Sequence, residues 1–444
     1  MNFNEFKKEL FDCANKLGCS AAEVYFEEGD AFSVNILEQE IDRYTAAVKY
    51  GLNLRVKYQG KDGYAYTEVF EDAEALVKRA IDNAKSIESE DEHPMQGKCE
   101  YEEVGTMLDP FKNATEQDKI QFVKDLETKA KEKDERVLRT PYCMLETSKL
   151  AIHISNTLGL DAKEEVSVSV VLLDVVMQQG DETKEAYAFE VGEYAGNADM
   201  VVDSAVSLCA DKFNAAPVKS GDYRILMSAR TMSEMLQVFW RQFSADLAQK
   251  GMTLMANKEG TQVANEIVNI IDDPKHKVYP RAFDGEGVPT KTKHLIENGV
   301  LKTLLHNLKT AKKANIESTG NAGRASAAGA ITIMPTNMYL QAGTKSYDEM
   351  VQSLGNGLII TELEGTHSGA NDVSGEFSFG AKGLLVENGK TVRAVDQITV
   401  AGSFYEMLMD IEELGGDMRF CAADGSSFFG APSTIIKKLK VAGS

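Results

Sequence analysis

Gly365-Thr-His-Ser-Gly369-Ala-Asn-Asp-Val-Ser-Gly375-Glu-Phe-Ser-Phe-Gly380 is the stretch of this 444-residue chain that says most about its fold. Its glycines are too dense for a helix, and they mark places where the backbone bends or passes close to another group. Further glycine-containing blocks lie upstream, at Ser318-Thr-Gly-Asn-Ala-Gly-Arg324, and downstream, at Asp396-Gln-Ile-Thr-Val-Ala-Gly402. The pattern predicts tight connections between strands in the C-terminal half of the chain.

Two hairpin signals strengthen the prediction of a strand-rich C-terminal part. Asn298-Gly299 and Asn388-Gly389 each lie between apolar runs, and both residue types tolerate the positive φ that a two-residue turn needs. Apolar spacing also predicts a strand over 223–227 and an amphipathic helix over 231–247. We expect a C-terminal β-rich domain over 223–444, with a large curved or barrel-like sheet.

Two smaller units are predicted to precede this domain. The pattern of residues 1–86 predicts an N-terminal α/β module in the order helix, three strands, helix. Residues 87–110, which include Glu90, form an acidic linker that is poor in large apolar side chains. Residues 111–222 combine helices and alternating strands in a middle α+β domain. The whole chain is therefore predicted to be α+β.

The net charge and the cysteine pattern of the chain limit which partners and which cellular compartment are expected. A net charge of −21 repels phosphate backbones, so no direct nucleic-acid partner is expected. The most apolar run, Val166–Met177, is too short to span a bilayer, and no signal-peptide core opens the sequence. The scattered cysteines are typical of reduced thiols in a cytoplasmic protein without a membrane partner; they are Cys13, Cys19, Cys99, Cys143, Cys209 and Cys421.

Common catalytic motifs are missing from the sequence. A P-loop, a Gly-x-Ser-x-Gly elbow and a His-Glu-x-x-His helix do not occur, and no two of the six histidines lie within five residues of each other. The loop around His367 is interpreted either as a tight turn or as a surface that contacts a ligand. In the second case the candidate substrate-binding residues are His367, Ser368, Gly369, Asn371 and Ser378.

Blocks in order along nearly the whole chain resemble the TldD/PmbA family, also called TldD/TldE. The most specific are Ala282-Phe-Asp-Gly-Glu-Gly-Val-Pro289, Ile296-Glu-Asn-Gly-Val-Leu301, Ser318-Thr-Gly-Asn321 and Gly375-Glu-Phe-Ser378. Earlier blocks that fit are Gly51–Val56, Gly63–Thr67, Ser155–Leu160 and Pro217–Gly221. Members of this family are known as peptidases and as modulators of DNA gyrase, so the resemblance implies proteolysis of unfolded or small peptides.

The resemblance also implies a branch of the family. The TldD branch carries a His-Glu-x-x-x-His metal helix and a later cysteine ligand, whereas the PmbA/TldE branch lacks this motif and pairs with TldD. In the corresponding helix here, Ser233 and Val238 stand at the two histidine positions and Glu234 at a degenerate general-base position. Hydroxyl and isopropyl groups cannot replace imidazole on zinc, and Cys421 alone is a weak metal candidate.

The implied role is that of a PmbA/TldE-like subunit without catalytic activity of its own. No cofactor is expected in this chain, while zinc or a similar metal is expected in a TldD-type catalytic partner, in a heterodimer or a larger assembly. Peptide substrates are expected as ligands, because a sheet edge can hold them by strand addition. Two alternatives stay open: a homodimeric peptide-binding scaffold, or an active hydrolase with a non-standard site built from His367, Asp372, Glu376 and Cys421.

Overall fold

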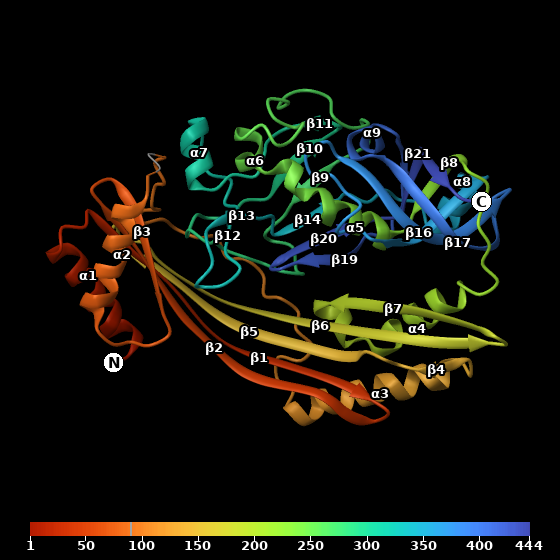
Figure 1. Cartoon of the computed structure of the whole chain (residues 1–444), viewed down its shortest axis with the longest axis horizontal. Helices are drawn as coiled ribbons and strands as arrows, with labels where there is room; N and C mark the ends of the chain where they lie inside the picture. The colour runs from red at the N-terminus through yellow and green to blue at the C-terminus, as the bar shows by residue number, and fades with distance from the viewer. Residues whose placement is uncertain (89–90) are drawn as a thin grey trace.

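A long, curved antiparallel sheet forms one side of the molecule (Figure 1). The structure is a computed structural model, and it describes residues 1–88 and 91–444. The strand order in this sheet is β3-β2-β1-β5-β6-β4, and β7 also pairs with β6. The strands are β1 (Ala21–Leu37), β2 (Glu40–Tyr58), β3 (Lys61–Thr67), β4 (Val137–Arg139), β5 (Cys143–Asn156), β6 (Asp161–Gln179) and β7 (Glu182–Val191).

Helices cover one face of this sheet, and the C-terminal half of the chain covers the other. Val24 of β1 packs in a core with the first two helices, whereas Val34, on the same face, packs with the next two. Tyr25 points to the opposite face and packs in a core with Phe283. The helical elements are α1 (Phe3–Lys16), α2 (Ala73–Ser86), α3 (Glu116–Lys133), η1 (Gly192–Gly196) and α4 (Ala198–Ala210).

Residues 1–86 have the predicted order of helix, three strands and helix. However, β1 pairs with β5 from Glu23 to Asn35, so strands from 1–86 and from 111–222 share one sheet. The boundaries proposed at 1–86, 87–110, 111–222 and 223–444 stay a prediction. The described residues of 87–110 contain no helix or strand, and Glu90 lies outside the described part.

The C-terminal half contains a closed barrel of five strands, which confirms the predicted barrel-like sheet. The ring closes because β17 pairs with β21 as well as with β16. Asn298 and Asn388 have φ of 49° and 51°, as predicted for their turns. The barrel strands are β8 (Gly221–Met227), β15 (Gly357–Glu364), β16 (Glu376–Glu387), β17 (Lys390–Ser403) and β21 (Thr434–Ala442), and β18 (Ile411–Leu414) pairs with β21.

A second C-terminal sheet packs beside the barrel, and α5 (Ala229–Phe239) lies between the two. Met232, Leu236 and Phe239 of this helix belong to the large core that both sheets share. The order of the second sheet is β11 (Val300–Leu301), β10 (Lys293–Glu297), β9 (Ile270–Asp272), β14 (Asn337–Leu340), β20 (Ser427–Ala431) and β19 (Arg419–Asp424). Smaller elements are β12 (Ala322–Gly323), β13 (Thr332–Ile333), α7 (Leu308–Ala314), α8 (Tyr347–Leu354) and α9 (Phe404–Met409).

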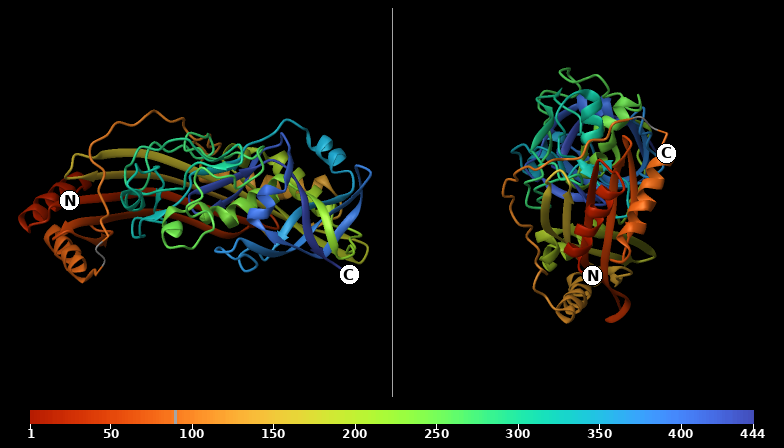
Figure 2. Two further views of the ribbon diagram at one scale, coloured as in Figure 1. Left: turned by 90° about the horizontal axis from the view of Figure 1, so that it is seen from above. Right: turned by 90° about the vertical axis from the view of Figure 1, so that its left-hand side faces the viewer.

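The barrel and the helices α1 and α2 lie at opposite ends of an elongated molecule (Figure 2). Between these ends the curved sheet runs underneath the second C-terminal sheet (Figure 1). No helix in the described residues is long and apolar enough to cross a membrane.

The prediction of one helix over 231–247 is wrong. α5 ends at Phe239, and the chain continues through η2 (Trp240–Phe243) and a short α6 (Ala245–Gln249). Ser244 between these two is extended, and Ala245 N–H donates to the carbonyl of Leu305 (3.0 Å). A tertiary backbone contact here overrides the helical periodicity of the sequence.

Gly63→Ala is expected to lower the free energy of unfolding by about 2 kcal/mol. Gly63 lies on β3 beneath α2, and an added Cβ would lie 1.9 Å from the carbonyl oxygen of Ala80. Helix and strand would therefore have to separate. Gly97→Ala is the matched control, because nothing lies within 4 Å of its added Cβ. Urea denaturation of both variants measures the difference, and equal stabilities would contradict the prediction.

Candidate functional site

The first candidate site is the junction where α5 packs against β19 and where Arg230 of α5 reaches the neighbouring strand β7. Ser228 caps the N-terminus of α5, and its Oγ accepts a hydrogen bond from Thr231 N–H (3.2 Å). Glu234 forms an ion pair with Arg230 (Oε1 to Nε, 3.1 Å), and each of these side chains is 17% exposed. Arg230 Nη1 also donates to the carbonyl of Tyr187 on β7 (2.7 Å). Burial, only partly offset by Arg230, raises the pKa of Glu234.

The side chains at the two expected histidine positions belong to the helix and to the core. Ser233 is buried, and its Oγ donates to the carbonyl of Ala229 (2.7 Å) and lies 3.3 Å from that of Arg419. Val238 is half-buried and packs against the large C-terminal core. Neither side chain supplies the ring nitrogen that a zinc site takes from histidine.

Cys421 lies on β19 at the same junction. Burial, together with the nearby Glu190, raises the pKa of its thiol to about 12, although Arg419 acts in the opposite direction. A single buried thiol supplies at most one of the three or four protein ligands that a zinc site takes.

Two arginines of the chain already neutralise the carboxylates at this junction. Arg230 pairs with Glu234, and Arg419 pairs with Glu190. Within residues 1–88 and 91–444, no three His, Cys, Asp or Glu side chains gather closely enough to hold an ion. A carboxylate paired with arginine, one buried cysteine, a hydroxyl and an isopropyl group do not make a zinc ligand set, so the residues here do not fit a metal ion.

Glu185→Gln is expected to weaken the pH dependence of stability between about pH 4 and pH 7. Asp174 lies on β6 beside β7, and burial followed by the neighbouring Glu185 raises its pKa to about 7 from 3.8. Since the folded pKa exceeds the unfolded one, this carboxyl contributes stability at low pH that is lost as the pH rises through 7. Glu185→Gln removes the like charge, which lowers the folded pKa and reduces the loss. Urea titrations at pH 5, 6, 7 and 8 compare the two proteins, and parallel pH profiles would contradict the prediction.

The glycine-rich loop between β15 and β16 has the geometry of a tight turn. Gly365 and Gly375 both have a φ of 73°, which other residues rarely adopt. A Cβ on Gly369 would lie 2.4 Å from the carbonyl oxygen of Ser378. Asn371 Oδ1 accepts hydrogen bonds from the backbone N–H groups of residues 373 and 374 (2.9 and 3.0 Å). These contacts explain the glycines without a ligand.

A groove of about 750 Å³ nevertheless lies beside this loop. Ser368, Gly369, Asn371 and Ser378 line it together with residues of β17, α9 and β21. His367 is exposed and is not part of this lining. The structure thus brings together four of the five predicted substrate-binding residues, and their role stays a prediction.

The side chains of the alternative hydrolase site are not assembled into a metal group in the described part of the chain. His367 and Asp372 lie on the loop between β15 and β16, and Glu376 is the first residue of β16, whereas Cys421 lies on β19 near Arg419.

The block Ser318–Asn321, which carried part of the resemblance, belongs to a buried polar network. Asn321 Nδ2 donates to Asp272 Oδ2 (2.7 Å), and Lys293 Nζ donates to both Asp272 Oδ2 and Asn321 Oδ1 (2.9 Å each). Asp284 Oδ2 accepts from Ala322 N–H (2.9 Å). Sequence reasoning missed this network because its members are far apart in the chain.

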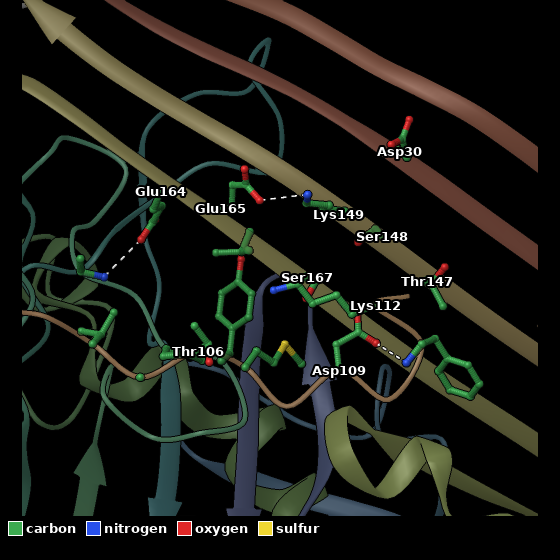
Figure 3. A pocket seen from close by; sticks show the side chains of 18 of the residues that line it. Asp30, Thr106, Asp109, Lys112, Thr147, Ser148, Lys149, Glu164, Glu165 and Ser167 are labelled. Atoms are coloured by element: carbon green, nitrogen blue, oxygen red, sulfur yellow. Dashed lines mark hydrogen bonds and ion pairs between the residues drawn. The ribbon is translucent and has the colours of Figure 1, made fainter. Parts of the chain in front are cut away.

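A second hollow, of about 430 Å³, lies between the curved sheet and the segment 102–112 (Figure 3). Thr106 and Asp109 lie on that segment, and Lys149 and Glu165 face one another across β5 and β6, with Nζ and Oε2 3.0 Å apart. The apolar alternation of the sequence predicts these strands, but it does not say which segment covers them.

The outer edge of β6 runs along this hollow. β7 pairs only with residues 170–179, so residues 161–169 have no strand on that side within the described chain. Asn156 N–H donates to the carbonyl of Leu160 (3.1 Å), so even-numbered residues of β6 direct their backbone groups toward β5. Because the direction alternates along a strand, the backbone N–H and C=O groups of Lys163, Glu165 and Ser167 point outward.

Three family models match the chain in order. PmbA/TldA metallopeptidase domain 1 matches residues 22–84, the central domain matches 109–212, and the C-terminal domain matches 220–443. This chain belongs to the PmbA/TldD metallopeptidase family. The predicted family is thereby confirmed, and both Ser233 and Cys421 lie within the part matched by the C-terminal model.

Solved structures share the fold of this PmbA/TldD-family chain over its whole length. A candidate modulator of DNA gyrase from Thermotoga maritima is 33% identical, with a TM-score of 0.91 over 99% of this chain and 100% of that one. TldE from Thermococcus kodakarensis has a TM-score of 0.89 over 99% and 100%; at 22% identity this likeness shows the fold alone.

Curated relatives of the family include proteins named as metalloproteases. One from Methanothermobacter thermautotrophicus is 32% identical over 244 residues, which are 52% of this chain and 52% of that protein. The chain thus aligns with about half the length of this relative. The metalloprotease TldD homolog of Buchnera aphidicola (from Acyrthosiphon pisum) is 26% identical over 63% of this chain and 62% of its own length.

Proposed function

We propose that this PmbA/TldD-family chain is a PmbA/TldE-like, non-catalytic subunit of a two-component metallopeptidase. The observation that carries the proposal is the ion pair of Glu234 with Arg230. A general base acts beside a bound substrate or metal-held water, and here a guanidinium pairs with one carboxylate oxygen while no histidine ligand stands beside the other. Ser233 and Val238 add no metal ligand beside it.

The role of the subunit is to complete a chamber around the zinc or similar metal of a TldD-type partner. Unfolded or small peptides are its ligands. All six cysteines are free, which supports a reducing, cytoplasmic setting. The net charge of −21 supports an effect on DNA gyrase through peptides and not through contact with DNA.

The outer edge of β6 is the surface that we assign to the peptide in this role. Backbone groups of Lys163, Glu165 and Ser167 are free to pair with an extended chain, and strand addition tolerates many sequences. The hollow beside this edge leaves room for side chains of the added strand.

Metal content and peptide hydrolysis, measured on one sample of the pure chain, test the main proposal. After dialysis against zinc, the isolated chain is expected to retain no stoichiometric metal and to leave an unfolded peptide uncut. Addition of a TldD-type protein is expected to produce cleavage that a chelator stops, at a rate above that of the partner alone. One metal per chain with chelator-sensitive cleavage by this chain alone would overturn the proposal.

Peptide binding at β6 has a separate test. Two fluorescent peptides of one sequence are compared, one methylated on the odd-numbered backbone nitrogens and one on the even-numbered nitrogens. In strand addition only one of these sets faces β6, so one peptide is expected to lose binding to the complex and the other to keep it. Ser167→Pro removes an outward N–H and should weaken binding, while the fold is checked by circular dichroism. Equal binding of both methylated peptides would exclude strand addition.

A further inference from the structure

A cavity of about 780 Å³ lies between the curved sheet and the C-terminal half, and it shares no lining residue with the hollow at β6. β2 and β3 supply one part of its wall, and η2, α6, α7 and β13 supply the rest (Figure 1). Cavities of about 300 to 1,000 Å³ commonly hold small organic ligands. None of the site residues predicted from the sequence lines this one.

The part of the wall formed by the sheet carries a buried amide with an unused acceptor. Leu52 and Leu54 of β2 pack in the core with α1 and α2, so the alternation of the strand turns Asn53 to the opposite face, where it lines the cavity. Asn53 is 5% exposed, and its Oδ1 has no hydrogen-bond partner among the described residues. Such an atom is costly unless something bonds to it. The amide therefore indicates a ligand that brings a donor.

Tyr64 of β3 lies beside this amide and also lines the cavity. It stands opposite Arg55, which is on the same face of β2 as Asn53. Within the described chain its hydroxyl forms no hydrogen bond. Burial raises the pKa of this phenol to about 12, so it keeps its proton at neutral pH and can donate. The acceptor of Asn53 and the donor of Tyr64 match the N–H and the C=O of an amide group.

Another part of the lining is apolar. Trp240 is 6% exposed, and its Nε1 donates to Asp424 Oδ2 (3.3 Å), which holds the indole in the wall. Burial of an apolar group of a ligand against such a surface is favourable. The aliphatic and thioether side chains of this surface are those of Leu247, Ile331, Ile333 and Met334.

One cation of the lining is left without an ion pair. Lys250 Nζ lies 2.7 Å from Asp246 Oδ2. Lys309 Nζ lies 3.1 Å from Asp91 Oδ2. Arg241 is exposed, and no carboxylate in the described part of the chain pairs with it. A single unbalanced guanidinium suits one carboxylate, whereas a nucleotide would bring several negative charges.

We propose that this cavity binds the C-terminal end of a short apolar peptide, or a free N-acyl amino acid that offers the same groups. The carboxylate pairs with Arg241, the last amide bonds to Asn53 and Tyr64, and an apolar side chain packs beside β13. Strand addition at β6 uses the backbone alone, so the two surfaces select on different features. This binding needs neither a metal nor a TldD-type partner, so it does not depend on the proposed subunit role.

The fluorescence of Trp240 tests the site, because this residue is the single tryptophan of the chain and lines the cavity. Acetyl-leucyl-leucine is titrated into the pure full chain, with calorimetry in parallel. A saturable change with a Kd below about 1 mM is expected for a ligand of this size. The C-terminal amide of the same compound lacks the charge and should bind about ten-fold more weakly.

Two variants separate the two ends of the ligand. Arg241→Gln is expected to bind the acid and the amide equally. Asn53→Leu is expected to weaken both by about ten-fold and to keep the preference for the acid. Arg43→Gln is the matched control and should bind like wild type, because Arg43 is also exposed and lies on β2 outside the cavity lining. Circular dichroism checks folding, and if Asn53→Leu does not fold, Arg241→Gln decides.

A longer peptide that ends in the same two leucines separates the two sources of the ligand. Binding as tight as that of acetyl-leucyl-leucine assigns the cavity to peptide ends, and loss of binding assigns it to free N-acyl amino acids. Three results would overturn the site: no saturable change or heat up to about 10 mM acid, equal binding of acid and amide by wild type, or binding that neither variant alters. The proposed subunit role would survive each of them, since metal content and hydrolysis test it separately.

Discussion

Arg230→Met is expected to lower the free energy of unfolding by about 3 kcal/mol, because removal of one partner leaves the buried Glu234 carboxylate without its counter-charge. Both side chains are 17% exposed, and Glu234 Oε2 already has no hydrogen-bond partner among the described residues. Arg230→Met also removes the donor to the carbonyl of Tyr187 and the contact of the guanidinium with its ring, 4.1 Å from the centroid. Urea denaturation at neutral pH gives the loss.

The double variant Arg230→Met/Glu234→Leu separates the charge from the packing. It should recover most of the stability, since a well-packed apolar pair often replaces a buried ion pair at little cost. Burial already raises the pKa of Glu234, and without Arg230 it rises further. The carboxyl of the single variant then contributes stability at low pH that is lost as the pH rises through the folded pKa, so the deficit is expected to be larger at pH 8 than at pH 5.

A loss in the single variant that is independent of pH and remains in the double variant would assign the effect to Tyr187 and not to the charge. The same set of variants bears on function. If Glu234 acted as a general base in this chain, wild type would hydrolyse a peptide and the double variant would not. If Glu234 is only a partner in a structural ion pair, neither protein is expected to hydrolyse it.

Local periodicity in the sequence predicts much of the secondary structure of this chain. The stripe Leu76, Val77, Ala80 and Ala84 lies on the buried face of α2, and both Asn-Gly turns are found where expected. These features depend on neighbours within a few residues, so a single sequence contains them.

Long-range pairing is not contained in local patterns. Nothing within β17 shows that it meets β21, and nothing within β1 shows that it runs beside β5 along most of its length. The same limit applies to Ser244, where a contact with Leu305 ends the predicted helix.

The candidate site likewise contains one contact that local spacing in the sequence indicates and others that it does not. Arg230 and Glu234 have the i, i+4 spacing of a helical ion pair, so their pairing was accessible from the sequence alone. The neighbours Glu190 and Arg419 come from β7 and β19 and were not. The unpaired edge of β6 also depends on where the neighbouring strand ends, which only the sheet register gives.

Lys293→Met is the second variant with a large expected effect, a loss of about 3 kcal/mol. Lys293 is 10% exposed and its partner Asp272 is fully buried, with Nζ and Oδ2 2.9 Å apart. Asp272 also accepts from Thr336 N–H and from Asn321 Nδ2 (2.7 Å each). Without Lys293 these contacts hold a buried carboxylate whose charge is uncompensated.

Lys291→Met, two residues earlier, is the control for this loss. Its partner Glu317 is 90% exposed and Lys291 itself 63%, at 3.3 Å, so its removal should cost less than about 1 kcal/mol. Thermal and urea denaturation of the two variants measure the difference. The contrast also decides how to interpret the block Ser318–Asn321: a large loss for Lys293→Met means that Asn321 and its neighbours hold β9 and β10 together. Equal small losses would leave that block without a structural explanation and make Asn321 and Lys293 candidates for direct contact with a peptide.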